Sequence, residues 1–304
     1  GQTIEVANDL PELSRLEERI KMPYEFIQTY GDSLRLGDNN TSAAPGGVIQ
    51  PWNSTFTSFK CMWVPPTALF KVGRALPGLR QRITLQLATS ELAEKVLFEA
   101  ADQSRKVRID NIRMYAAYVT PDATFQIPKQ VVLSLPMMGL TKASHSSGAQ
   151  THTFSVAPST DRVYVFFQDG DGADLSIGSS PTLFLDKWVT CSASYAGQTL
   201  PAVQYEAFSV NDSLRPFLDF QAATGRMIRS LGAADNQTQY AARPIYGFAF
   251  ETPSNSISTT LTLRASSTAS NLIRGVGYQH HKICVLSYGS DNVCQSVVVE
   301  ENLK

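Results

Sequence analysis

Short segments in which apolar and polar residues alternate run along most of the chain after Trp52. In the clearest of them, Arg82 to Leu87, the side chains of Ile83, Leu85 and Leu87 share one face. Alternation with a period of two is typical of a β-strand with one buried face. The same pattern predicts further strands over residues 56–64, 107–119, 131–135, 151–156, 162–167, 188–195, 245–250, 259–265, 282–288 and 296–299.

Three stretches follow helical spacing instead. Leu13, Leu16 and Ile20 fall on one side of a predicted helix over residues 8–21, which Asn8 or Asp9 can cap. This apolar stripe either packs on its own domain, the interpretation we favour slightly, or forms an arm that docks on a neighbouring subunit. The other two predicted helices cover residues 90–102 and about 213–231, and Gly225 weakens the second.

Many short strands, few helices and frequent turn residues predict a β-sandwich or β-barrel. The 304 residues show no fixed repeat, which excludes a short-repeat solenoid or propeller. A jelly roll of eight strands with its loops takes roughly 130 to 170 residues, so two of them would use the whole chain.

Composition narrows the function classes. Hydrophobic residues make up 43% of the chain, which is typical of a packed protein and not of a disordered one. The net charge of −1 lacks the basic excess with which proteins neutralise nucleic-acid phosphates, so we expect no direct sequence-specific nucleic-acid binding. We also expect no export signal and no membrane span, because no apolar run approaches the roughly 18 residues that a span requires.

The cysteines and histidines do not form a recognisable catalytic or metal-binding motif. No two of the four cysteines are spaced as C-x-x-C, and we expect buried thiols in preference to a bridge between Cys284 and Cys294. None of the four histidines has the spacing of a zinc hydrolase, and the adjacent His280 and His281 should point to opposite faces of a strand. We therefore predict that the chain is not an enzyme and needs no cofactor. The histidines are His145, His152, His280 and His281, and the other two cysteines are Cys61 and Cys191.

One acidic segment could hold a metal. Asp169, Asp171 and Asp174 could offer carboxylate oxygens to calcium. The order of ligands in an EF-hand is not met, however, and Asp and Gly are common turn residues between two strands. We favour a turn over a calcium site.

Three segments of the first half follow one another in order: Trp63 to Phe70, Leu79 with the strand that comes after it, and Val107 to Pro121. In the second half, the run Arg162-Val163-Tyr164-Val165-Phe166-Phe167-Gln168 is followed by the segments at 181–184 and 195–201. In order and spacing, these segments resemble the double-jelly-roll major capsid proteins of the adenovirus hexon, Polinton-like, adintovirus and virophage lineage. The run from Arg162 is similar to a core strand of the second barrel of that family.

The resemblance implies an all-β fold of two consecutive eight-stranded jelly-roll barrels with short inserted helices. An N-terminal arm and loop would occupy residues 1–50, the first jelly roll 51–138 together with part of the arm, and the second 139–304. It further implies a homotrimer of pseudo-hexagonal outline that tiles the icosahedral shell of a double-stranded DNA virus. Its partners would be itself, neighbouring capsomers, and penton and minor capsid proteins, and its location the virion shell, assembled inside the host cell.

Three alternatives stay open from the residues alone. One is a single-jelly-roll or penton-type virion protein with an added β domain. Another is a secreted calcium-dependent β-sandwich module, which the N-x-S/T sequons at Asn40, Asn53, Asn211 and Asn236 would permit. The third, an enzyme on a jelly-roll scaffold, would need clustered histidines and carboxylates that the sequence does not show.

Overall fold

A computed structural model of the chain describes residues 126–169, 187–203, 212–225, 244–251 and 258–301 as continuous segments. It also describes isolated positions and short stretches elsewhere, namely 13, 16, 17, 20, 68, 72, 76, 78, 79, 82–86, 113, 114, 120, 122, 205, 240 and 241.

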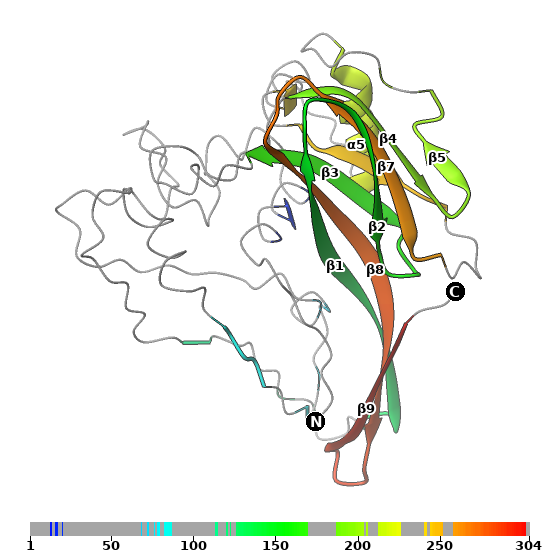
Figure 1. Ribbon diagram of the computed structural model, residues 1–304. Helices are drawn as coiled ribbons and strands as arrows, with labels where there is room; N and C mark the ends of the chain where they lie inside the picture. The colour runs from blue at the N-terminus through cyan, green and yellow to red at the C-terminus, as the bar shows by residue number, and fades with distance from the viewer. Residues whose placement is uncertain are drawn as a thin grey trace, which may run out of the picture.

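The described residues are mostly β-sheet, with one helix inserted between the fifth and sixth strands (Figure 1). The elements in chain order are β1 (Gln130–His145), β2 (Gly148–Ser155), β3 (Arg162–Asp169), β4 (Trp188–Tyr195), β5 (Gln198–Leu200), α5 (Leu214–Thr224), β6 (Tyr246–Ala249), β7 (Thr260–Ser267), β8 (Leu272–Tyr288) and β9 (Cys294–Glu301). No described helix is long and apolar enough to cross a membrane.

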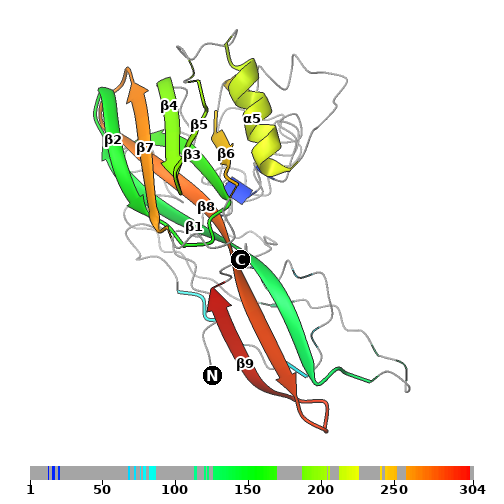
Figure 2. The ribbon, with the colours of Figure 1, turned by 90° about the vertical axis from the view of Figure 1, so that its right-hand side faces the viewer.

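The strands form two antiparallel sheets whose order is that of a jelly roll. One sheet has the order β1-β8-β3-β6, and the other has the order β2-β7-β4-β5. The chain crosses from one sheet to the other between most successive strands, and only the β4–β5 and β8–β9 pairs stay within one sheet. This arrangement of eight strands in two facing sheets is the double Greek key of a jelly roll. Figure 2 shows the two sheets from the side.

The main core lies between the two sheets and is rich in aromatic side chains. Phe167 of β3 stacks on Trp188 of β4 with ring centroids 4.0 Å apart, and Trp188 meets Tyr246 of β6 edge-on at 4.5 Å. Tyr205 continues the stack 5.2 Å from Tyr246. These side chains fill the interior of the jelly roll, since all four are buried.

The outer face of the β1-β8-β3-β6 sheet is also covered. Helix α5 lies over this face (Figure 2). Its side chains Phe217 and Phe220 pack there with Tyr164 and Phe166 of β3. The helix ends where Gly225 adopts a left-handed conformation with φ of 70°, a common way to terminate a helix.

The lower part of this sheet continues past the jelly roll as a three-stranded extension, formed by residues 130–135 of β1, 282–288 of β8 and all of β9 (Figures 1 and 2). One face of the extension packs against Ala68, Val72, Leu76 and Leu79, and together they form a third apolar cluster. Strands β1 and β8 run without a break from the jelly roll into the extension.

The predicted all-β class is confirmed for the described residues, and each strand predicted after residue 130 corresponds to an observed one. One strand prediction is wrong: residues 82–86 have no regular secondary structure and are exposed, so the alternation of Ile83 and Leu85 does not mark a buried face. Strand β1 runs unbroken through residue 138, where the boundary between the two jelly rolls was expected, and the division of the chain into domains stays a prediction. The first jelly roll expected over 51–138 falls mostly outside the described residues, as do the helix over 90–102 and Cys61.

Candidate functional site

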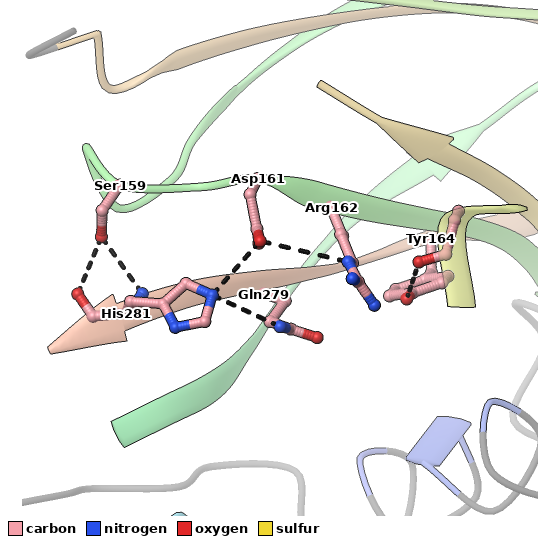
Figure 3. Close-up of polar contacts among 7 residues, drawn as sticks. Ser159, Asp161, Arg162, Tyr164, Gln279 and His281 are labelled. Atoms are coloured by element: carbon pink, nitrogen blue, oxygen red, sulfur yellow. Dashed lines mark hydrogen bonds and ion pairs between the residues drawn. The ribbon is translucent and has the colours of Figure 1, made fainter. Parts of the chain in front are cut away.

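A partly exposed polar cluster lies on the outer face of the first sheet, where the loop between β2 and β3 meets β8 (Figure 3). The Ser159 hydroxyl donates to the carbonyl oxygen of His281 at 2.9 Å and accepts from the backbone N–H of the same residue at 3.2 Å. The imidazole Nε2 of His281 lies 3.2 Å from Asp161 Oδ2 and 3.5 Å from Gln279 Nε2. Arg162 Nε approaches the same Asp161 oxygen at 4.0 Å.

The cluster contains a serine, a histidine and an aspartate, but not the geometry of a hydrolase. A catalytic serine must share a hydrogen bond with the imidazole that takes its proton. Here Ser159 bonds only to the main chain of His281, and its hydroxyl is occupied as both donor and acceptor. The arrangement therefore fastens the β2–β3 loop to β8 and does not activate a nucleophile.

The polar cluster continues along β3 to the C-terminal end of α5, which Tyr164 and Arg162 approach. The Tyr164 hydroxyl donates to the carbonyl oxygen of Ala223 at 3.1 Å, and burial raises the pKa of Tyr164 to about 12, so this donor keeps its proton. A Cβ atom placed on Gly225 would lie 3.5 Å from a guanidinium nitrogen of Arg162. A cation beside the last turn of a helix interacts favourably with its dipole, and α5 has no basic residue of its own there. Arg162 of β3 thus supplies the positive charge that the last turn of α5 lacks.

A second polar group is buried inside the jelly roll at the end nearest the turn between β1 and β2. The Arg274 side chain is fully buried, and its guanidinium donates to His145 Nδ1 and, at 3.4 Å, to the carbonyl oxygen of Leu263. Burial, followed by the nearby charges of Arg274 and His152, lowers the pKa of His145 to about 4. Burial also lowers the pKa of Arg274 to about 10, which leaves it charged at neutral pH. No sequence motif predicts this pair, and the one signal is an arginine that stands between Ile273 and Gly275 in an otherwise apolar run.

The other two histidines lie where the strand pattern predicted. His281 belongs to the outer cluster, whereas the His280 ring lies 5.8 Å from the Tyr278 ring on the opposite face of β8. The described residues contain no group of three or more His, Cys, Asp or Glu side chains that could hold a metal ion. In the calcium candidate, Asp169 ends β3, while Asp171 and Asp174 lie outside the described residues. The turn that we favour for this segment and the alternative of a calcium site are therefore both untested.

The structure places the apolar stripe of the N-terminal segment against the same chain. Leu13 and Leu16 are buried, and Leu16 packs in the cluster beneath α5, with Ile20 partly buried beside it. A Cβ atom added to Gly277 of β8 would lie only 2.1 Å from a methyl carbon of Leu16, so this leucine occupies the space that the glycine leaves. Docking of the segment on a neighbouring subunit stays a prediction.

The extension carries an exposed apolar row on the face turned away from the third cluster. Val132 of β1, Val285 of β8 and Val298 of β9 are register partners across the three strands. Val132 is 59% exposed and Val298 is 43% exposed. Such a row on the three-stranded extension is available for contact with another protein.

Comparison with known proteins gives no match at the level of sequence. No family model matches the chain. No curated protein matches it either.

Comparison of structures finds several viral capsid structures, each only distantly similar to this chain. A 3.5 Å cryo-EM structure of the Sputnik virophage matches 61% of this chain and 42% of its own, with a TM-score of 0.42 and 9% identity. The mavirus major capsid protein matches 62% of this chain and 44% of its own, with a TM-score of 0.38 and 9% identity. The PBCV-1 virus capsid matches at a TM-score of 0.32 and 8% identity, over 53% of this chain and 50% of its own. The chain thus spans half or less of the length of these proteins, and likenesses of this size carry no argument about function.

Proposed function

We propose that this chain is a structural subunit of a viral capsid, a major capsid protein that forms pseudo-hexameric trimers in the icosahedral shell of a double-stranded DNA virus. The observation that carries the proposal is the complete jelly-roll strand order, β1-β8-β3-β6 facing β2-β7-β4-β5, around an interior filled with aromatic rings. Jelly rolls occur in capsid proteins, lectins and cupins. A cupin-like enzyme needs space and metal ligands inside the barrel, where this chain has stacked Phe167, Trp188 and Tyr246.

The exposed surface fits a subunit whose partners are other proteins. The valine row of the extension offers apolar contact area, and the charged cluster around Asp161, Arg162 and His281 lies on the same outward face of β8, farther up the strand. Apolar contact area bordered by polar groups is the usual composition of a protein interface. In the proposed shell, the partners are further copies of this chain, neighbouring capsomers, and penton and minor capsid proteins.

The mass of the native protein tests the proposal. Light scattering on the purified chain should give three times the chain mass of 33.3 kDa, and electron microscopy of the same sample should show particles of hexagonal outline with two barrels per chain. A single-jelly-roll virion protein would give one barrel per chain. A stable monomer that binds glycans only with calcium would refute the capsid proposal.

A matched pair of variants tests which surface makes the subunit contact. V132E places a charge in the exposed valine row, and L214E places the same charge on α5 at a position that is 50% exposed. We expect V132E to convert trimers to monomers and L214E to leave the trimer intact, because only the first lies in the proposed contact. If both variants remain trimeric, the contact lies on another surface.

A further inference from the structure

The buried pair of His145 and Arg274 is a cluster of two basic side chains inside the jelly roll. Their relative exposures are 2% and 0%, and one guanidinium nitrogen of Arg274 points at Nδ1 of His145. A guanidinium can only donate hydrogen bonds, so Nδ1 must be the unprotonated, accepting nitrogen of a neutral imidazole. The contact therefore exists only while His145 is uncharged.

Among the side chains that the structure describes, which do not include that of Asp169 at the end of β3, those packed around His145 carry no negative charge. From β3, the Phe167 ring lies 4.8 Å from the imidazole, and from β2 the His152 ring lies 6.2 Å away. From β7, the Leu263 carbonyl is occupied by Arg274, and from β4 the buried thiol of Cys191 has its pKa raised by burial and stays neutral. Backbone hydrogen bonding at Gly148 favours the protonated imidazole, against the combined effect of burial, Arg274 and His152.

We propose that this pair makes the jelly roll acid-sensitive: protonation of His145 removes the acceptor of Arg274 and loosens the barrel end at the turn between β1 and β2. A second positive charge beside a buried guanidinium is repelled by it, and neither charge can be solvated without opening the core. The same end carries His152, whose pKa is also lowered by burial and by Arg274. This acid sensitivity arises within one chain, so it does not depend on the proposed capsid function.

The direction of the pH dependence follows from which state binds the proton. Above pH 6.5 the imidazole is neutral in both the folded and the unfolded chain, and His145 has no effect. As the pH falls below 6.5, the unfolded chain takes up a proton that the folded chain refuses, so stability declines until the pH passes about 4. Over that interval the ratio of folded to unfolded molecules falls by up to roughly 300-fold on account of this one residue.

The experiment compares urea unfolding of the full chain between pH 7.5 and 4 for the native protein and for H145Q. Glutamine offers an oxygen to Arg274 and does not titrate. Carboxylates lose stability in the same interval, so the measured quantity is the difference between the two pH profiles. We expect the native protein to lose substantially more stability than H145Q as the pH falls, up to the same roughly 300-fold in the folded ratio. The variant H281Q, which removes a histidine from the outer surface, should keep the acid loss of the native protein.

A second measurement does not depend on how the variant folds. The chain has only four histidines, so the imidazole resonances can be followed by NMR in the native protein during acid titration. A histidine that remains neutral below pH 6 and titrates together with loss of the native spectrum is the expected result. Equal pH profiles for the native protein and H145Q would overturn the proposal, as would four histidines that all titrate near 6.5 in the folded state.

Discussion

The Tyr195 hydroxyl joins three segments that are far apart in the sequence. Tyr195 ends β4, and its hydroxyl oxygen lies 2.8 Å from the carbonyl oxygen of Pro158 and 2.8 Å from that of Ser258. A third carbonyl, that of Ala157, lies 3.3 Å away. Pro158 and Ala157 belong to the loop between β2 and β3, and Ser258 lies two residues before β7. The substitution Y195F removes this hydroxyl and keeps the ring.

The expected loss of stability follows from the number of groups involved. The hydroxyl has one proton to donate, so it makes one strong hydrogen bond at a time, with a net contribution of about 0.5–1.5 kcal/mol. Its removal also leaves acceptors at a largely buried position short of a donor, which costs about 1–3 kcal/mol when a polar group is left unsatisfied. Because the ring stays in the core, no cavity is created. We expect Y195F to lower the free energy of unfolding by about 1–3 kcal/mol.

Equilibrium unfolding in urea at pH 7 measures this difference, and Tyr288 provides the matched control. The Tyr288 side chain is also buried, but its hydroxyl has no hydrogen-bond partner among the described residues. Removing a buried hydroxyl that makes no hydrogen bond should change stability by no more than about 0.5 kcal/mol in either direction. The reasoning would be refuted if Y195F lost no more stability than Y288F.

Two further predictions concern the packing of β8 and the reactivity of the thiols. A Cβ atom on Gly275 would lie 2.2 Å from a ring carbon of the fully buried Phe166, so G275A should lower the free energy of unfolding by about 1–3 kcal/mol, and pairing it with F166L should restore part of the loss in urea unfolding. Burial raises the pKa of the fully enclosed Cys191 thiol, so alkylation of the native protein followed by peptide mass mapping should label the partly exposed Cys294 and spare Cys191. Labelling of Cys191 at the same rate in native protein and in denaturant would contradict that packing.

Much of the second half of the fold could be predicted, because its strands obey simple local rules. The alternation of Trp188 to Tyr195 gave β4 with its observed bounds, and the run from Arg162 gave β3 within two residues. The turn at Gly197, with φ of 81°, fits the short β4–β5 hairpin that glycine permits. The helix α5 was expected to weaken at Gly225, and it ends there.

Other features depend on contacts that no local pattern contains. The first half of β8 was missed because Gly275 and Gly277 interrupt its apolar pattern, and these glycines make room for side chains from β3 and from the N-terminal segment. The alternation of Ile83 and Leu85 predicted a strand, although burial depends on a partner surface that those residues do not meet.

The polar sites could not be predicted for the same reason. The outer cluster unites Asp161 with His281, which lie 120 positions apart, and the inner pair unites His145 with Arg274, which lie 129 positions apart. Only the strand order of the finished jelly roll brings such residues together.

The unbroken passage of β1 and β8 from the jelly roll into the extension has a mechanical consequence. The two strands share sixteen register partners in one continuous antiparallel ladder, from Gln130 and Ser287 to His145 and Leu272. A load applied along the extension is therefore carried by many backbone hydrogen bonds in parallel and reaches the barrel directly, with no hinge to absorb it. A partner protein that binds the extension would therefore transmit force directly to the jelly roll.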